Sequence, residues 1–351
     1  MITIYETMSN DNTEQLFRLQ YQIARVLVSS YYPVVVPYWR RSCSSMTVGS
    51  ICKSFTRQLE QENVPEAKIS IDLMVAHVLG KTTLHGVTPS THLNTDQIRQ
   101  LESMCEQRKR RMPVQYIIGE WDFCDLMLKV QPPTLIPRPE TEELANYVIS
   151  HVRRVRQNQV KILDIGSGSG ALIIAILHAL PTATGVAVDI ADHACSLTSE
   201  NAQLTGVHHR LIVEKLDITT DVAELSRLCP FDLIVGNPPY LTDECLNNLE
   251  TELSYEDNKA LYGGPDGLDV TRSILAAASR LLRPNGSVWM ELGLGQPLEI
   301  KTLLEKQTGY HLQHVETLQD FTNRDRFCHL EYKLLTNEDP SSQKYFAVPV
   351  M

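Results

Sequence analysis

From residue 160 onward, short runs of β-branched and aliphatic residues alternate with segments whose apolar residues recur at helical spacing. Strands that alternate with helices in this way form a parallel sheet with helices on both faces. The predicted fold class is therefore α/β, with a mostly parallel, doubly wound sheet. The expected strands are residues 161–165, 185–190, 211–216, 232–236 and 287–291, with residues 312–315 and 328–333 as candidates for two closing strands.

A glycine-rich turn follows the first of these strands and leads into a predicted helix. Glycine allows positive φ angles and a close approach of the backbone to a ligand, and the start of a helix offers unpaired N–H groups. The alternate-glycine spacing G-x-G-x-G differs from the G-x-G-x-x-G spacing of dinucleotide-binding turns. We predict that the whole turn binds a cofactor, and it consists of Gly166, Ser167, Gly168, Ser169 and Gly170.

Acidic residues end the next two strands. Asp189 lies 19 residues after Gly170, at a place where a carboxylate can accept both hydroxyls of a ribose. Asp217 is predicted to lie near an adenine, with its neighbour Ile218 packed on the base. The alternative interpretation of Asp217 is a turn residue at the end of a strand. Together with the glycine turn, these residues predict a site for a nucleoside cofactor.

The tetrapeptide N-P-P-Y follows the fourth strand, at the edge where open α/β sheets bind ligands. It consists of Asn237, Pro238, Pro239 and Tyr240. The Asn237 side-chain oxygen and the Pro238 carbonyl can each accept one N–H of a primary amine or amide. The two prolines hold the loop rigid, and Tyr240 can pack on a planar target.

An amide nitrogen is a poor nucleophile because its lone pair is delocalised, so an enzyme must orient it toward a methyl donor. The tetrapeptide therefore predicts a methyltransferase that uses S-adenosyl-L-methionine (AdoMet) and needs no covalent nucleophile. We expect Asn237, Pro238 and Tyr240 to be catalytic. All four residues, Pro239 included, are expected to bind the substrate, and Asn237 is also expected to contact the cofactor.

Residues 50–112 carry apolar stripes at helical spacing, which predict a small helical bundle that serves packing. Asn94 is the predicted N-cap of its later helix, with Asp96 in the first turn. The basic run at residues 108–111 is interpreted as a solvated helix end, with a binding patch as the alternative. The proline-rich stretch at residues 131–142 is interpreted as an irregular interdomain linker or lid.

Bulk properties limit the partners of the chain. It has 351 residues and a formal net charge of -10, whereas proteins that bind duplex DNA or structured RNA usually carry an excess of basic residues. No apolar run approaches the roughly eighteen residues of a membrane span. The eight cysteines contain no C-x-x-C pair and are interpreted as reduced thiols, and no metal site is predicted. We expect a protein partner, and neither nucleic acid nor a membrane.

Residues 15–59 have the composition of an organellar transit segment, because arginines occur there without any acidic residue. Glu6, Asp11 and Glu14 do not fit such a segment, so a disordered arm or an internal start is the alternative. We expect a mitochondrial protein, and otherwise a cytoplasmic one. The polar residues from 336 onward predict a disordered tail.

Longer motifs indicate the family. The N-P-P-Y tetrapeptide with its upstream glycine turn resembles both adenine-N6 nucleic-acid methyltransferases and the HemK-like release-factor glutamine methyltransferases. Residues 134–142, 260–268 and 291–296 resemble three further motifs of the HemK-like family, in the same order. One departure is visible, because Asp257 follows Glu256 where the family usually has proline.

The resemblance implies a seven-stranded class I methyltransferase domain, a helical domain that docks the release factor, and methylation of the glutamine in a Gly-Gly-Gln motif. It favours the bacterial and organellar branch, because shorter cytosolic relatives lack the helical domain. The alternatives are a nucleic-acid N-methyltransferase, which a basic recognition domain would favour, and a non-catalytic AdoMet-binding scaffold, against which the intact Asn237 and glycines argue. The expected parts are a transit segment or arm at 1–49, a docking domain at 50–121, a linker at 122–159, a methyltransferase domain at 160–335 and a tail at 336–351.

Overall fold

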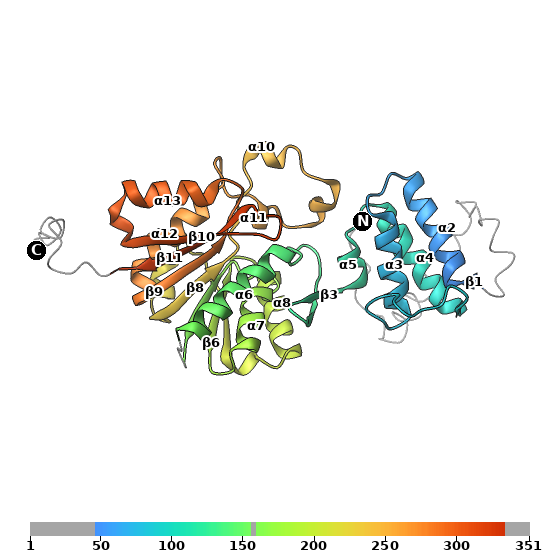
Figure 1. Cartoon of the computed structure of the whole chain (residues 1–351), viewed down its shortest axis with the longest axis horizontal. Helices are drawn as coiled ribbons and strands as arrows, with labels where there is room; N and C mark the ends of the chain where they lie inside the picture. Colours follow the sequence, from blue (N-terminus) through green and yellow to red (C-terminus); the bar gives the residue numbers. More distant parts are fainter. Residues whose placement is uncertain (1–45, 156–158, 334–351) are drawn as a thin grey trace, which may run out of the picture.

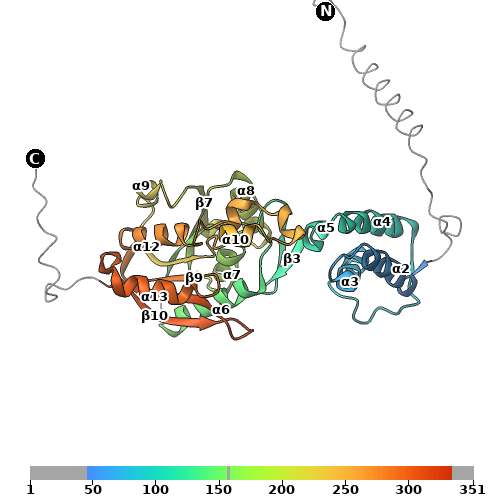
Figure 2. The same cartoon turned by 90° about the horizontal axis from the view of Figure 1, so that it is seen from above.

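The structure, a computed structural model, describes residues 46–155 and 159–333. A bundle of helices lies beside a larger α/β part, and the two are joined through α5 (Val114–Ile118) and β3 (Glu120–Phe123), as Figure 1 and Figure 2 show. The predicted tail at 336–351 and the predicted transit segment up to residue 45 lie outside the described residues.

The α/β part is built on a seven-stranded sheet with the order β10-β11-β9-β8-β5-β6-β7. The strands β5 to β9 pair in parallel, and β11 is antiparallel to both β9 and β10. The predicted α/β class and both closing strands are therefore confirmed. The strands are β5 (Lys161–Ile165), β6 (Thr184–Asp189), β7 (Leu211–Lys215), β8 (Phe231–Gly236), β9 (Leu282–Glu291), β10 (Leu312–Gln319) and β11 (Asp325–Tyr332).

Helices cover both faces of this sheet. Ile162 and Leu233 belong to one buried cluster, whereas the next residue on each strand, Leu163 and Ile234, belongs to the other. Because neither face meets solvent, the central parallel strands read as almost continuous apolar runs. Helices α6 (Pro139–Arg154) and α7 (Ala171–Ala179) contribute to the first cluster, and α12 (Asp269–Leu281) and α13 (Gln296–Lys306) to the second.

The proline-rich stretch is irregular only as far as Arg138. Pro139 is the first residue of α6, so the prediction of irregular structure over residues 139–142 is wrong. Proline is favourable in the first turn of a helix because the N–H there has no intrahelical partner and the ring fixes a helical φ. Helix α6 buries Leu144 and Val148 against the sheet, within the range predicted as a linker.

The N-terminal helices α2 (Val48–Gln61), α3 (Ala67–Val78) and α4 (Thr95–Lys109) pack around one buried apolar cluster. The predicted N-cap is confirmed, because the Asn94 side chain accepts hydrogen bonds from the N–H groups of Asp96 and Gln97. The remaining elements are β1 (Met46–Thr47), β2 (His92–Leu93), β4 (Leu126–Lys129), α8 (Asp192–Leu204), α9 (Val222–Leu225), α10 (Asp243–Leu246), α11 (Asn258–Leu261), and the 3-10 helices His208–Arg210, Thr251–Tyr255 and Thr308–Tyr310.

Across residues 46–155 and 159–333, no helix is long and apolar enough to cross a membrane. In the same ranges, no three His, Cys, Asp or Glu side chains form a group that could hold a metal ion. The cysteines described there are all free thiols.

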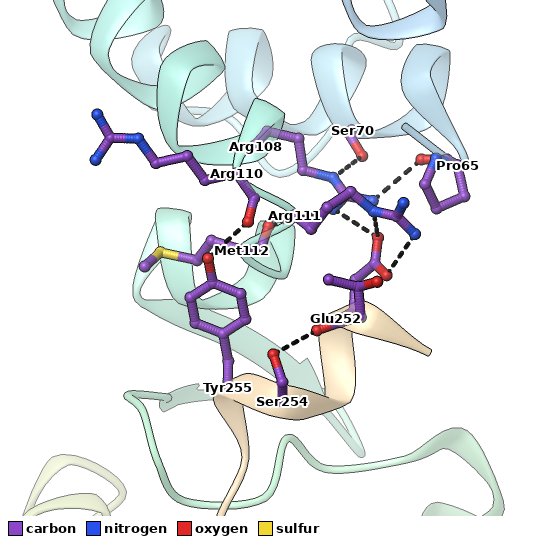
Figure 3. Close-up of polar contacts among 10 residues, drawn as sticks. Pro65, Ser70, Arg108, Arg110, Arg111, Met112, Glu252, Ser254 and Tyr255 are labelled. Atoms are coloured by element: carbon purple, nitrogen blue, oxygen red, sulfur yellow. Dashed lines mark hydrogen bonds and ion pairs between the residues drawn. The ribbon is translucent and has the colours of Figure 1, made fainter. Parts of the chain in front are cut away.

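The basic run at the end of α4 contacts the α/β part. Arg108 is only 4% exposed, and its guanidinium donates to the Ser70 hydroxyl at 3.1 Å, the Pro65 carbonyl at 3.0 Å and the Glu252 carboxylate at 3.0 Å. Arg111 donates to both carboxylate oxygens of Glu252, at 2.7 and 2.8 Å (Figure 3). The interpretation as a solvated helix end is therefore wrong for these two arginines, which pair with a carboxylate more than 140 residues later in the chain.

We expect Glu252→Gln to lower the free energy of unfolding at pH 7 by about 3 kcal/mol, because it leaves the buried Arg108 without its anionic partner. Burial raises the pKa of Glu252, but hydrogen bonds from Arg111 and Arg108 outweigh it, so the net pKa lies below the ordinary value of 4.5. The stabilisation is thus fully present above pH 4.5 and is lost as the pH falls through the lowered pKa.

Urea unfolding of wild type and Glu252→Gln at several pH values measures this contribution. The matched control is Glu244→Gln, because Glu244 lies exposed on the nearby helix α10; its effect should stay within about 0.5 kcal/mol. Equal stability of wild type and Glu252→Gln at pH 7 would contradict the importance of this contact.

Candidate active site

The carboxyl ends of β5, β6, β7 and β8 open onto one cavity of about 180 Å³. The ends of parallel strands share one edge of a sheet, so turns that are far apart in the sequence meet there. Most of the predicted site residues line this cavity, namely Gly166, Gly168, Asp189, Asp217, Ile218, Asn237 and Pro239.

The glycine turn and Asp189 form one hydrogen-bonded unit. The Asp189 carboxylate accepts the Gly168 N–H at 2.9 Å and the Ala191 N–H at 3.0 Å, so its orientation is fixed. Gly166 and Gly168 have φ angles of 74° and 57°, in the region that favours glycine. A Cβ placed on Gly166 would meet no atom within 4 Å, so the space over this residue is open to a ligand.

The other residues of the turn are buried against α8. The Ser167 hydroxyl lies 3.3 Å from that of Thr198, and the Ser169 carbonyl accepts a hydrogen bond from Asn201 at 2.9 Å. A Cβ on Gly170 would come within 2.9 Å of the Thr198 side chain. These contacts explain the close packing of turn and helix. Neither serine is among the residues that line the cavity.

The carboxyl groups of Asp164 and Asp189 interact electrostatically. Burial, reinforced by the negative charge of Asp189, raises the pKa of Asp164 to about 8. Burial also raises the pKa of Asp189, while hydrogen bonds from the N–H groups of Gly168 and Ala191 oppose that rise. The raised pKa favours the protonated form of Asp164 at neutral pH. Asp189 is the one of the two carboxyl groups that lines the cavity.

Asp217 forms a turn, and it also lines the cavity. Its carboxylate accepts the Thr219 N–H and hydroxyl, each at 2.7 Å, which is a turn at the end of β7. Asp217 nevertheless lines the cavity, and its neighbour Ile218 is buried in the cavity wall.

Asn237 lies where two cavities meet. It lines the cavity described above and also a second one of about 590 Å³, which extends between the helical bundle and the α/β part. Of the rest of the tetrapeptide, Pro239 lines the first cavity, Tyr240 lines the second and Pro238 is buried. A group bound on one side therefore faces a group bound on the other across Asn237.

The motifs at residues 260–268 and 291–296 hold the N-P-P-Y loop in place through hydrogen bonds and close packing. The Gln296 side chain donates to the Tyr240 carbonyl at 3.2 Å and accepts the Gly293 N–H at 2.8 Å. Leu241 pairs with the 260–268 segment through hydrogen bonds to the Leu261 carbonyl and from the Gly263 N–H. A Cβ on Gly263 would come within 2.4 Å of the Pro239 carbonyl, so only glycine fits this contact.

A hydrogen-bonded series of buried polar side chains holds Asn237 and Tyr240. The sequence motifs did not predict this series. The Asn237 amide nitrogen donates to the Thr141 hydroxyl at 3.3 Å, which donates to Glu291 at 2.7 Å. Arg326 donates to the other oxygen of Glu291 and to the Tyr240 hydroxyl, both at 3.1 Å. Thr141 and Glu291 lie in the motifs at 134–142 and 291–296, whereas no sequence signal indicates Arg326.

Asp257, the departure from the family pattern, fits the loop without strain. Its φ of -67° is the value that a proline ring imposes. Unlike proline, it donates its N–H to the Pro133 carbonyl at 2.7 Å, and its side chain caps α11 by accepting the Lys259 N–H. The preceding Glu256 is buried and paired with Arg138 at 2.7 Å, so the loop is held on both sides of the substitution.

A seven-stranded sheet of this order, with a glycine turn and an acidic strand end facing an N-P-P-Y loop, is the fold of a class I methyltransferase. Residues 50–119 match the family model described as the PrmC N-terminal domain. Residues 142–250 match that of the ribosomal protein L11 methyltransferase (PrmA).

Relatives that match most of the chain identify the family. The chain is 39% identical to the MTRF1L release factor glutamine methyltransferase of Homo sapiens, over 79% of this chain and 85% of that protein. It is 33% identical to the release factor glutamine methyltransferase of Deinococcus radiodurans, over 80% of this chain and 97% of that protein. The chain belongs to the release factor glutamine methyltransferase family and is a methyltransferase.

Proposed function

We propose that this enzyme transfers the methyl group of AdoMet to the side-chain amide nitrogen of the glutamine in the Gly-Gly-Gln motif of a release factor. The observation that carries the proposal is the position of Asn237, which lines both the cavity at the strand ends and the cavity beside the helical bundle. A methyl donor in the first cavity and an amide in the second would meet at this side chain.

The first cavity fits AdoMet through its own residues. The open space over Gly166 accommodates the methionine end, and the fixed carboxylate of Asp189 is placed to accept the ribose hydroxyls. Ile218 offers an apolar surface for the adenine, with Asp217 beside it. When bound, AdoMet supplies an electrophilic methyl group on sulfur.

The N-P-P-Y loop supplies the acceptors for the glutamine amide. The Asn237 side-chain oxygen and the Pro238 carbonyl each accept one N–H, which directs the nitrogen lone pair toward the methyl group. Tyr240 packs beside the amide. Arg326 holds Tyr240 in place by a hydrogen bond to the Tyr240 hydroxyl, and its guanidinium carbon lies over the Tyr240 ring, 5.1 Å from the ring centroid. Burial raises the pKa of Tyr240, so its hydroxyl stays protonated.

The helical bundle is proposed to dock the release factor. Residues of α3, α4 and the segment after α4 line the second cavity together with residues of the α/β part. A substrate that reaches Asn237 through this cavity therefore contacts both parts of the enzyme. The docking function rests on this placement together with the family.

We expect Asp189→Ala to weaken AdoMet binding by about 1.5–3 kcal/mol, the usual value of hydrogen bonds to a charged group. Isothermal titration calorimetry measures the change. The control is Asp192→Ala, because Asp192 is an exposed acidic residue close to Asp189 that pairs with Lys215. Unchanged AdoMet affinity in Asp189→Ala would rule out the ribose assignment.

We expect Asn237→Ala to lower the rate of methylation about a hundredfold or more, because one oriented hydrogen bond at the reacting amide is lost. Release-factor binding should change little, since the docking surface is untouched. Single-turnover methylation beside a pull-down separates the two effects, with the exposed Asn247→Ala as control. A near wild-type rate would refute the amide-orienting role, and loss of binding instead would make Asn237 a docking residue.

We also propose that the enzyme acts in mitochondria, on the composition of residues 15–59. A fluorescent fusion of residues 1–60 should enter mitochondria, and replacement of Arg18 and Arg25 by glutamate should reduce its import. Diffuse cytosolic fluorescence of the unmodified fusion would contradict the proposal.

A further inference from the structure

The proposed role of Asn237 requires its side-chain oxygen to face the substrate. A carboxamide carries an acceptor oxygen and a donor nitrogen of nearly equal size, so its shape alone does not decide which one points where. With the nitrogen toward the substrate, the amide would present a donor to the N–H groups of the glutamine. The enzyme therefore needs a neighbouring group that accepts a hydrogen bond from the Asn237 nitrogen and cannot donate one to the Asn237 oxygen.

Thr141 is such a partner because its single proton is already committed. The Thr141 hydroxyl donates to a carboxylate oxygen of Glu291 at 2.7 Å, and a hydroxyl has only one proton to give. Toward Asn237 it can therefore only accept, and the Asn237 nitrogen lies 3.3 Å from it. The Asn237 oxygen is thereby left to face the cavities.

Glu291 determines the direction of the hydrogen bonds that link it through Thr141 to Asn237. Its side chain is fully buried at the end of β9, and as a carboxylate it accepts hydrogen bonds without donating. Burial raises the pKa of the Glu291 carboxyl, and the hydrogen bond from Thr141 and the charge of Arg326 oppose that rise. Arg326 on β11 donates to the other Glu291 oxygen at 3.1 Å, and this contact with a permanently charged guanidinium favours the carboxylate form. Both oxygens of Glu291 thus have donors, and the donor on the Asn237 side is Thr141.

We propose that Thr141 and Glu291 are positioning residues that hold the Asn237 amide with its oxygen toward the reacting nitrogen. The inference rests on the proposed function, because it assigns the groups that prepare Asn237 for that role. Thr141 belongs to the first turn of α6 and Asn237 follows β8, so the arrangement is held by elements of the core.

The first test replaces Thr141 by valine, which keeps the shape and removes the hydroxyl. We expect kcat to fall about tenfold or more, as when a residue that orients a functional group is lost, with the KM for the release factor and the AdoMet affinity unchanged. Thr141→Ser, which retains the hydroxyl, should recover most of kcat. The control is Thr271→Val, because Thr271 is also a buried helix residue, on α12, and its hydroxyl has no hydrogen-bond partner among the described residues.

The second test repeats Thr141→Val in the Asn237→Ala background. If Thr141 acts through Asn237, its replacement causes no further loss of rate there. A further loss equal to that in the wild type would overturn the proposal, and so would an undiminished kcat in Thr141→Val alone. A wild-type rate of Asn237→Ala itself would instead refute the proposed function, so the two failures are distinguishable.

Thermal unfolding shows whether Thr141→Val is folded. Should it not fold, Glu291→Gln carries the same test, because a glutamine can donate to Thr141 and so frees the hydroxyl proton to point at the Asn237 oxygen. The amide then turns its nitrogen toward the substrate, and kcat should fall at least tenfold in the wild-type background but not in the Asn237→Ala background. An equal loss in both backgrounds would overturn the proposal.

Discussion

The parallel arrangement of β5, β6, β7 and β8 is the constraint on which the site depends. Because both faces of these strands are buried, their register is fixed by apolar packing, and their carboxyl ends lie along one edge. The glycine turn, Asp189, Ile218 and Asn237 lie at or just after the ends of four different strands and still line one cavity. The hydrophobic core thus positions the strand ends that carry these groups, and the hydrogen bond from the Gly168 N–H then fixes the Asp189 carboxylate.

Local patterns were sufficient to predict the strands but not all of their limits. The predicted start of β9 at residue 287 is wrong, because the strand begins at Leu282 and runs through Pro284 and Gly286. Those residues usually argue against a strand interior. Here an irregularity opposite Phe231 and Leu233 accommodates them, and such a pairing is set by the neighbouring strand rather than by the local sequence.

Predictability of the site depends on how far apart the interacting residues lie in the sequence. Gly168, Asp189 and Asn237 are recognisable because each has a functional reason visible in its own short motif. Thr141 and Glu291 contact each other across 150 residues, and Arg326 has no local signature at all. The prediction of a solvated helix end at residues 108–111 was wrong for the same reason, because the carboxylate that pairs with the buried Arg108 belongs to a distant 3-10 helix.

The cavity beside the helical bundle, through which the substrate is proposed to reach Asn237, is lined by residues that make such long-range contacts. Arg108 and Arg138 both line it, but each is paired there, with Glu252 at 3.0 Å and Glu256 at 2.7 Å respectively. Glu66 and Glu250 line the cavity as well, so its lining carries more acidic than basic side chains. That balance disfavours a phosphate backbone, whereas an uncharged Gly-Gly-Gln segment is not repelled by it. The Arg108–Glu252 pair, which joins the two parts of the enzyme, therefore leaves Arg108 unavailable to a phosphate group and suits the uncharged segment proposed to pass between them.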